Sequence, residues 1–393
     1  MKPNQILVAN IGSTSFKFRL LEMPAERLLA RGGVERIGAA ESIWSFQRGD
    51  FPAEKGAGFF PDYAAAIRWL EERLGGFSNL AAVGFKPVMA QEISGTQVMD
   101  ERVLQAMEAV NTLLPAHNPP YIAAVRSFRA AHPELPCIGT FETAFYDQLP
   151  AHNRRYPVPL EWETRYGIRR HGFHGASHRY VTQRCAELLG RERLRLISCH
   201  LGGSSSIAAV RDGLAIDSSW GMTPQSGLPQ NNRVGDFDVF ALIYLARDQG
   251  LGIDAVEKAL TTEAGLKGMS GLPSGDLRDI VEASENGNAN AQIALDVLVG
   301  SIRKYIGQFL VELNGADALI FTAGMGENES FLREAVCANL DFCGLEIDLN
   351  LNRVTRATET KISTSRSKID VWVIPTNEEI IIARNAWAKI STP

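Results

Sequence analysis

Cysteine, long apolar runs and an excess of charge of one sign are all scarce in this sequence. The five cysteines among 393 residues are scattered, so reduced thiols are expected rather than a disulfide framework or a zinc site. Residues 1–10 are too short and too polar to form a secretory signal, and no apolar run approaches the length of a membrane span. A net charge of −5 argues against a general nucleic-acid or membrane-surface binder, although a locally positive site remains compatible with it. We therefore expect a cytoplasmic protein with no nucleic-acid or membrane partner.

The first notable stretch is a strand, a small polar turn and a second strand near the start of the chain. Residues 6–9 are apolar, residues 12–15 read Gly-Ser-Thr-Ser, and apolar residues alternate with Lys17 and Arg19 over 16–20. Such a turn presents backbone N–H groups and hydroxyl donors at one point, which suits a phosphate. An ordinary polar β-hairpin explains this segment equally well. The candidate phosphate contacts are Ser13, Ser15 and Lys17.

A second copy of the pattern lies in the middle of the chain. Residues 196–210 repeat the order of apolar strand, Gly/Ser turn and apolar strand. Two such hairpins predict a duplicated domain with a phosphate-gripping turn in each half. This arrangement resembles the actin, heat-shock and sugar-kinase superfamily, whose members hold a nucleotide in the cleft between two α/β domains.

The length and the alternation of strands with helices support two α/β domains. We expect an N-terminal phosphate- and acceptor-binding domain over 1–150 and a C-terminal nucleotide-binding and dimerisation domain over 151–377. A closing helix over 378–393 is expected to pack back on the first domain. Residues 31–60 are expected to form irregular strands and turns, and residues 97–114 to form one amphipathic helix.

Three histidines and two glycines crowd into residues 171–178, His-Gly-Phe-His-Gly-Ala-Ser-His. A metal cluster is one explanation, but no carboxylate or cysteine lies nearby at ligand spacing. A solvent-exposed loop is another.

At this point the sequence resembles the acetate kinase family over nearly its whole length. That family transfers a phosphoryl group between ATP and a short carboxylic acid to form an acyl phosphate. Nine segments carry the resemblance in order: 10–18, 117–119, 141–145, 166–178, 200–202, 233–236, 270–271 with 276–279, 321–328, and 375–379.

The resemblance implies a role for individual residues in this chemistry. A carboxylate acceptor is ionised near neutral pH, since its pKa is about 4, so it needs no general base. The task is to bring an anion to a polyanion, which requires positive charge and hydrogen-bond donors. The implied catalytic residues are Arg233, His174, Glu142 and the supporting donor His117, and Mg²⁺ would be held by Asn10 and Glu378.

Substrate contacts are implied in the same way. The carboxylic acid would meet Lys86 and an apolar pocket of Val88, Ala116, Phe173 and Pro224. ATP or ADP would contact Ser13, Ser15, Lys17, His200, Gly202, Gly203, Ser204, Asp276, Leu277, Arg278, Gly324, Met325 and Asn328. The resemblance also implies a homodimer formed through the second domain.

Several positions depart from the family pattern, mostly on the acceptor side. Lys86 stands in place of an arginine, Glu142 in place of an aspartate and Gly203 in place of an asparagine, and Ala116 is smaller than its usual counterpart. Lysine keeps the charge of arginine but loses its bidentate fork. These departures keep two alternatives open: the same fold with another acceptor or phosphoryl donor such as pyrophosphate, and a nucleotide-binding regulator with little turnover.

Overall fold

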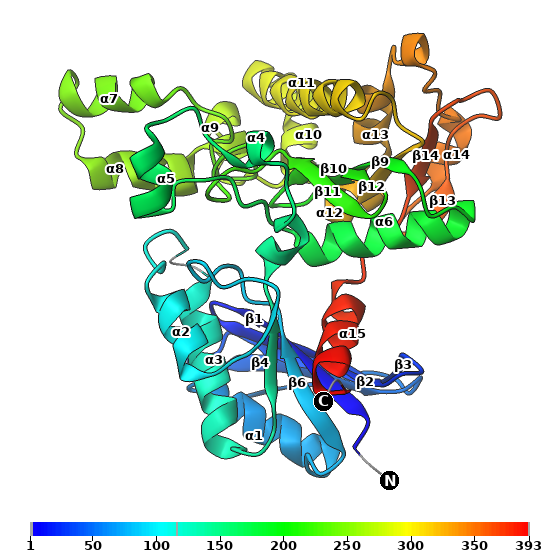
Figure 1. Ribbon diagram of the computed structural model, residues 1–393. Helices are drawn as coiled ribbons and strands as arrows, with labels where there is room; N and C mark the ends of the chain where they lie inside the picture. The colour runs from blue at the N-terminus through cyan, green and yellow to red at the C-terminus, as the bar shows by residue number, and fades with distance from the viewer. Residues whose placement is uncertain (1–2, 115–116, 392–393) are drawn as a thin grey trace. The chain divides into compact units, whose positions relative to one another are not determined.

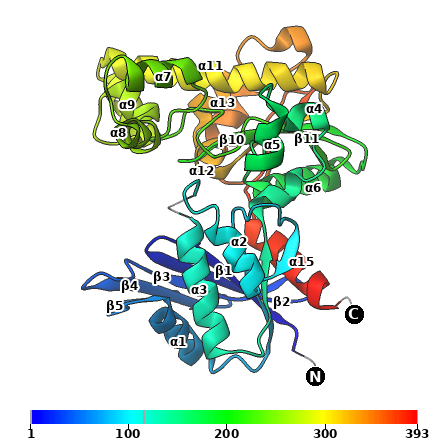
Figure 2. The same cartoon turned by 60° about the vertical axis from the view of Figure 1, so that its left-hand side comes forward.

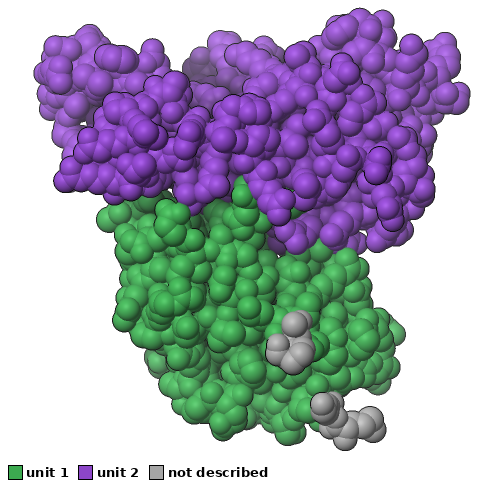
Figure 3. Space-filling view, viewed as in Figure 1, with its two compact units in different colours: residues 1–147, 377–393 green, residues 148–376 purple. Residues whose placement is uncertain are grey.

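The structure is a computed structural model that describes residues 3–114 and 117–391. The chain divides into two compact units, which Figure 3 colours separately. Unit 1 comprises residues 1–147 and 377–393, and unit 2 comprises residues 148–376. No helix within the described ranges is both long enough and apolar enough to cross a membrane.

Unit 1 contains a mixed sheet of eight strands in the order β5-β4-β3-β2-β1-β6-β8-β7. The strands β1 to β5 are antiparallel neighbours, whereas β6 runs parallel to both β1 and β8. Their bounds are β1 Gln5–Gly12, β2 Ser15–Glu22, β3 Arg27–Glu35, β4 Ser42–Arg48, β5 Glu54–Gly58, β6 Leu80–Phe85, β7 Thr96–Val98 and β8 Cys137–Thr140.

Helices cover both faces of the middle of this sheet (Figure 1). On β1, Leu7, Ala9 and Ile11 join one apolar core with residues of α1 and α3, while the alternating Ile6 and Val8 are equally buried. The last helix, α15, packs on β1, β6 and β8. The helices of unit 1 are α1 Tyr63–Leu74, α2 Glu101–Glu108, α3 Asn118–Ala131 and α15 Glu378–Ser391, with a 3₁₀ turn at Glu142–Tyr146.

Unit 2 contains a mixed sheet of six strands in the order β11-β10-β9-β12-β14-β13. The strands are β9 Arg195–His200, β10 Ser206–Arg211, β11 Leu214–Ser218, β12 Ala318–Thr322, β13 Thr360–Lys361 and β14 Asp370–Val373. The helices, visible in Figures 1 and 2, are α4 Ala151–Arg154, α5 Leu160–Tyr166, α6 Gly175–Leu189, α7 Val239–Arg247, α8 Ile253–Lys258, α9 Gly265–Ser270, α10 Leu277–Glu285, α11 Ala289–Glu312, α12 Ala323–Asn328, α13 Ser330–Cys337 and α14 Leu349–Val354.

The two sheets share one topology. In each, three antiparallel strands (β3-β2-β1 and β11-β10-β9) are followed by two parallel ones (β6-β8 and β12-β14). The pairs β1-β2 and β9-β10 form the two hairpins that the sequence pattern predicted. The expected duplicated α/β fold is therefore confirmed.

One expectation about local structure is confirmed in part and another is wrong. Residues 31–60 form strands and turns as expected, but β4, β5 and the end of β3 are regular strands of the sheet. Residues 97–114 do not form one helix, because the chain first pairs as β7 and then begins α2 after Asp100. The Asp100 side chain accepts a hydrogen bond from Val103 N at 2.9 Å and so fixes the start of that helix.

Candidate active site

In unit 1 a tyrosine hydroxyl anchors the first hairpin turn. The turn spans residues 13–14, with Gly12 paired opposite Ser15. Tyr63 donates a hydrogen bond to Gly12 O at 2.6 Å, which anchors the last residue of β1. A Cβ at Gly12 would lie 2.5 Å from Ser15 Oγ, so the tight approach of the two strands requires glycine there. The turn therefore presents Ser13 and Ser15 from a fixed backbone.

Asn10 and Lys17 lie directly opposite each other on β1 and β2, so their side chains share one face of the sheet. The Asn10 amide oxygen accepts a hydrogen bond from the buried Tyr121 hydroxyl at 3.5 Å. Burial raises the pKa of Tyr121 to about 12, so this phenol stays protonated and remains a donor. Lys17 forms an exposed ion pair with Glu35 at 3.0 Å.

Two carboxylates converge on Lys86 at the end of β6. Its Nζ lies 2.9 Å from Glu142 Oε1 and also contacts Glu378 Oε2. Burial disfavours the charge of Lys86, but the carboxylates of Glu142 and Glu378 outweigh it and hold the pKa of the ammonium well above its usual value. Glu142 N donates to Pro87 O at 2.9 Å, which ties the loop after β6 to the 3₁₀ turn. The structure thus places three of the predicted residues in one buried cluster.

The donor set in unit 1 suits Mg²⁺. Mg²⁺ prefers oxygen ligands, uses one or two carboxylates and keeps several waters. Asn10, Glu142 and Glu378 offer amide and carboxylate oxygens of this kind. With two carboxylates and one amide, this site is not a cluster of three His, Cys, Asp or Glu side chains, and the described ranges contain no such cluster arranged to hold a metal ion.

The remaining acceptor-side residues of unit 1 are placed less closely. His117 immediately precedes α3, and Val88 is half-buried in the loop after β6. Ala116 lies outside the described residues. Phe85, next to Lys86, is fully buried and packs edge-on against Phe128 with ring centroids 5.7 Å apart.

In unit 2 the predicted histidines form a stacked cluster at the start of α6. His174 takes the left-handed conformation, with φ of 54°, at the N-terminal cap of that helix. A non-glycine residue in this region costs energy and is common at functional sites. The imidazole of His174 lies between the ring of His200, 3.8 Å away, and the ring of Trp220, 4.3 Å away. The ring plane of His174 is therefore fixed from both sides.

Serine hydroxyls bind the ring nitrogens of this cluster. His174 Nδ1 lies 2.9 Å from Ser206 Oγ, and His200 Nδ1 lies 2.8 Å from Ser177 Oγ. His178 contacts two serines, one at each ring nitrogen. Burial and the nearby His200 hold the pKa of His178 well below its usual value. These contacts weigh against both earlier alternatives, a metal cluster and an exposed loop.

Arg233 is anchored through one arm of its guanidinium. Nη1 donates to Ser204 Oγ at 3.1 Å and to Gln230 Oε1 at 3.2 Å. Gln230 is itself buried and donates from Nε2 to Pro224 O at 2.7 Å. Among the described residues, Nη1 is the only nitrogen of this guanidinium with a hydrogen-bond partner. Burial lowers the pKa of Arg233, as expected for a cation taken partly out of water.

The second hairpin loop and the turn after β12 meet at Gly202. Leu201 O accepts hydrogen bonds from Met325 N at 2.8 Å and Gly326 N at 3.0 Å. A Cβ at Gly202 would approach Gly324 N at 3.9 Å, so the two predicted glycines are neighbours. Asn328 donates to Gly324 O at 2.9 Å. The predicted strand-to-helix turn at 322–328 is confirmed by β12 and α12.

Gly203 faces the loop that precedes Arg233. A Cβ at Gly203 would lie 3.3 Å from the amide nitrogen of Asn231, and Asn231 N donates to Gly203 O. Asn231 therefore fills the space beside the position where the family pattern has an asparagine. The predicted Asp276 caps α10, accepting from Arg278 N and Nε, and Leu277 is buried behind it. These hydrogen bonds from Arg278 lower the pKa of Asp276 to about 2.

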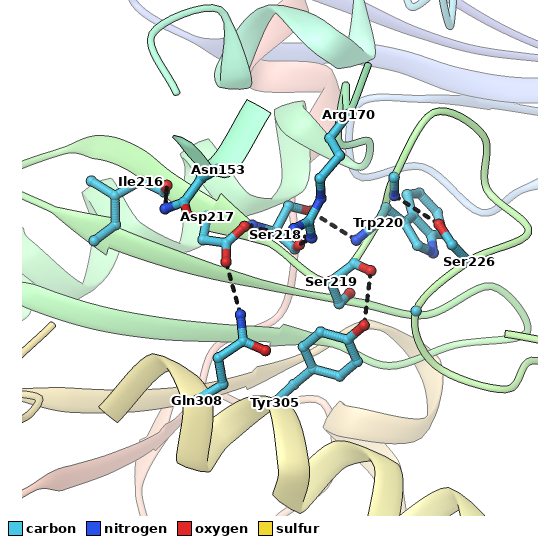
Figure 4. Close-up of polar contacts among 12 residues, drawn as sticks. Asn153, Arg170, Ile216, Asp217, Ser218, Ser219, Trp220, Ser226, Tyr305 and Gln308 are labelled. Carbon is cyan, nitrogen blue, oxygen red and sulfur yellow. Dashed lines mark hydrogen bonds and ion pairs between the residues drawn. The ribbon is translucent and has the colours of Figure 1, made fainter. Parts of the chain in front are cut away.

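The apolar candidates of unit 2 are both buried. Phe173 packs edge-on against Trp220 with centroids 5.2 Å apart, and Pro224 lies in the loop that Gln230 fixes. Figure 4 shows Trp220 beside a buried polar network that includes residues of β11. In that network Asp217 lies 3.5 Å from Arg170 and accepts from Gln308 at 2.9 Å.

Sequence reasoning missed three residues that hold the predicted ones: Tyr121, Trp220 and Gln230. The grouping of the histidines with their serine partners, in contrast, had a usable signal. His174 and His178 are four residues apart on a helix and so share a face, and Ser198 and His200 are two apart on a strand. Ser206 pairs opposite His200 on β10 and therefore belongs to the same face. The period of each element could have grouped these side chains.

Comparisons with known proteins identify the family of this chain. The model of the acetokinase family matches residues 5–384. The acetate kinase of Geobacillus kaustophilus is 42% identical, with 97% of this chain and 98% of that protein covered. The acetate kinase of Bacillus subtilis strain 168 is 41% identical at the same coverage.

Solved structures agree as well. The crystal structure of Porphyromonas gingivalis acetate kinase superposes with a TM-score of 0.89 at 35% identity, covering 99% of this chain and 100% of that one. A propionate kinase from Francisella tularensis gives a TM-score of 0.89 at 30% identity, with 97% and 98% covered.

Proposed function

The chain belongs to the acetokinase family and catalyses the ATP-dependent phosphorylation of a carboxylate, and we propose that Arg233 is the residue on which phosphoryl transfer to a short-chain acid depends most. The observation that carries this proposal is the anchoring of Arg233 through Nη1 alone. Nε and Nη2 can then form a planar fork toward two oxygens, one of the carboxylate and one of the phosphoryl group. Because the guanidinium is half-buried, its charge is screened less than that of an exposed arginine and acts more strongly on charge that develops there.

His174 and His117 are proposed to donate hydrogen bonds to the transferring phosphoryl group. His174 is suited to this role because His200 and Trp220 fix its ring plane. A preorganised donor stabilises the transition state without reorganising during the reaction. No group in this proposal acts as a general base, since the acceptor is already ionised at neutral pH.

Lys86 is proposed to attract the carboxylate of the acid while it holds Glu142 and Glu378 in place. Asn10 and Glu378 would hold Mg²⁺, with Glu142 beside them. When bound, Mg²⁺ would offset the negative charge of the ATP phosphates. Tyr121 keeps the Asn10 amide oriented by donating to its oxygen.

The nucleotide is proposed to bind at both hairpin loops. Ser13, Ser15 and Lys17 in unit 1 would contact phosphate oxygens, as would the loop of Gly202, Gly203 and Ser204 in unit 2. The adenosine would lie against Gly324, Met325 and Asn328, with His200, Asp276, Leu277 and Arg278 nearby. This assignment places the adenosine on unit 2 and the charged contact of the acid, Lys86, in unit 1.

The acid is proposed to be acetate or propionate. Val88, Phe173 and Pro224 would surround its alkyl end, together with Ala116. All four side chains are apolar, so an acid with one more CH₂ would gain about 0.8 kcal/mol if the space is open.

We also propose a cytoplasmic homodimer formed through unit 2. The support is the outer surface of α7, where no residue is buried and Val239, Phe240 and Tyr244 are each more than half exposed. A groove of about 760 Å³ beside it is lined by Phe237, Leu260 and Met269 among others. Exposed apolar surface of this extent marks an interaction site.

The test is a panel of acetate, propionate and butyrate with ATP or pyrophosphate, in which hydroxylamine traps the acyl phosphate. We expect product with ATP and a short acid. Arg233→Ala should lower kcat about 10²–10³-fold with little change in the KM for ATP. Arg129→Ala, which removes an exposed cation on α3, is the matched control and should keep normal kinetics. A near-normal kcat for Arg233→Ala would rule out its role, and turnover with pyrophosphate alone would replace the proposed donor.

A further inference from the structure

We propose that a chain of hydrogen bonds, Ser198–His178–Ser206–His174, fixes the proton of neutral His174 on Nε2. The chain runs from β9 through α6 and β10 to His174, the proposed hydrogen-bond donor to the phosphoryl group. Ser198 Oγ lies 2.8 Å from His178 Nδ1, His178 Nε2 lies 2.8 Å from Ser206 Oγ, and Ser206 Oγ lies 2.9 Å from His174 Nδ1. Ser198, Ser206 and His178 are all completely buried.

The direction of this chain follows from its far end. Within the described residues, Ser198 Oγ has one hydrogen-bond partner, the Nδ1 atom of His178. A hydroxyl that accepts there would leave its own hydrogen buried without an acceptor, which is costly, whereas an unused lone pair costs less. Ser198 therefore donates to His178 Nδ1.

The remaining protons are then determined one after another. A neutral His178 that accepts at Nδ1 carries its hydrogen on Nε2 and donates to Ser206 Oγ. Ser206 Oγ has only two partners in the described ranges, so its hydrogen must go to the other, His174 Nδ1. A His174 that accepts at Nδ1 carries its hydrogen on Nε2. The low pKa of the buried His178 supports its neutral state.

The consequence for the enzyme is that His174 remains a neutral hydrogen-bond donor of fixed direction. Protonation at Nδ1 would require Ser206 and His178 both to reverse, which would leave Ser198 without an acceptor. Ser198, His178 and Ser206 are thus positioning residues that act through His174. Only the kinetic part of this inference depends on the proposed function, because the position of the proton can be measured in the resting protein.

The direct test is NMR of the full chain labelled with ¹⁵N-histidine, in which imidazole ¹⁵N shifts identify the protonated nitrogen. The signals of His174 are assigned by their loss in His174→Asn. In the parent protein at pH 7.5 we expect Nε2–H and an unprotonated Nδ1. A dominant Nδ1–H form, or a doubly protonated ring, would overturn the inference whatever the enzyme's activity.

Ser198→Ala tests the chain from a residue two hydrogen-bonded groups away from His174. We expect a mixture of both His174 tautomers and a loss of kcat of about twofold to tenfold, with the KM values unchanged. Ser198→Thr keeps the hydroxyl and should restore both. Ser177→Ala removes the hydroxyl on His200 instead and should leave the His174 tautomer unaltered.

Ser206→Ala provides a second route if Ser198→Ala does not fold, and it should mix the His174 tautomers in the same way. An unaltered His174 spectrum in a folded Ser198→Ala or Ser206→Ala protein would refute the inference. So would an equal shift in Ser177→Ala, which would indicate general loosening of the cluster. If the tautomers mix while kcat stays normal, the chain of hydrogen bonds stands and the proposed role of His174 fails.

Discussion

At the scale of single residues, three departures from the family pattern, Lys86, Glu142 and Gly203, each lie against a neighbouring side chain. Lys86 has one charge and no fork, yet it reaches both Glu142 and Glu378. The longer Glu142 brings its carboxylate to a lysine that ends in a single ammonium group. Asn231 occupies the space beside Gly203. Each change is accompanied by a neighbour that compensates for it in shape or charge.

Lys86→Met should destabilise the protein by about 3–5 kcal/mol at pH 7.5, because it leaves two buried carboxylates without their cation. The loss should shrink as the pH falls and the carboxylates take up protons. Lys17→Met is the matched control, since its ion pair with Glu35 is exposed and should contribute less than about 1 kcal/mol. Urea unfolding of both variants measures the difference, and equal costs would show that the Lys86 cluster is not electrostatically tight.

At the scale of elements, α11 and β11 meet through a buried acid (Figure 4). Gln308 from α11 donates to Asp217 on β11, and Tyr305 donates to Ser219 O at 3.3 Å. Burial raises the pKa of Asp217 to about 6, and the nearby Glu312 adds to this, although Arg170 opposes it. Asp217 therefore keeps its proton to a higher pH in the folded state than in the unfolded state.

The upward shift of the Asp217 pKa predicts how the stability of the protein depends on pH. The folded state binds more protons than the unfolded state between about pH 4 and 6, so stability falls as the pH rises through that window. Asp217→Asn removes this dependence. We expect the unfolding free energy of the variant, relative to the parent, to rise by about 1–2 kcal/mol from pH 5 to 8.

Asp317→Asn is the control for that measurement. Burial alone would raise the pKa of Asp317, but the hydrogen bonds from Arg195 lower it by more, so the net shift of the pKa is downward. Its contribution is complete above its ordinary pKa, and the cost of removing it should be constant from pH 5 to 8. A flat difference for Asp217→Asn would show that Asp217 is charged in the folded protein.

Elements also show where sequence reasoning succeeded and where it stopped. Both hairpins, the strand-to-helix turn and the closing helix follow from local patterns of apolar and small residues. Strands were expected over 31–60, but their regularity was not, because Gly32 and Gly33 weaken a strand in isolation. Here a Cβ at Gly32 would lie 2.2 Å from Ser45 O, so close contact between strands requires glycine. Such a contact exists only once the sheet has formed.

The candidate site divides in the same way. Arg233 and His174 could be proposed from the sequence because they stand in ordered motifs that resemble those of the family. Gln230 and Trp220 could not, since each acts by touching another residue that is distant in sequence or packed by the fold. A sequence pattern therefore points to a candidate reacting group more easily than it points to the residues that position that group.

At the scale of the whole molecule, the exposed apolar surface of α7 predicts a dimer. Phe240→Glu places a charge in the centre of that surface, and sedimentation should show a shift from dimer toward monomer. Phe51→Glu is the control, because Phe51 is exposed to the same extent, 72%, but lies in unit 1. A monomeric parent protein, or a dimer that tolerates Phe240→Glu, would contradict the proposed interface.

The return of α15 to unit 1 has a consequence for synthesis on the ribosome. Residues 148–376 emerge and can fold while β1 and β6 still lack the helix that covers Ile6 and Val8. Gly84 on β6 lets that helix pack closely, since a Cβ there would lie 2.9 Å from Ile382. Glu378, the partner of Lys86, is therefore translated only after all of unit 2. A nascent chain stalled before residue 378 would carry a complete unit 2 and a unit 1 whose apolar residues on β1 and β6 are uncovered, a surface that chaperones can recognise.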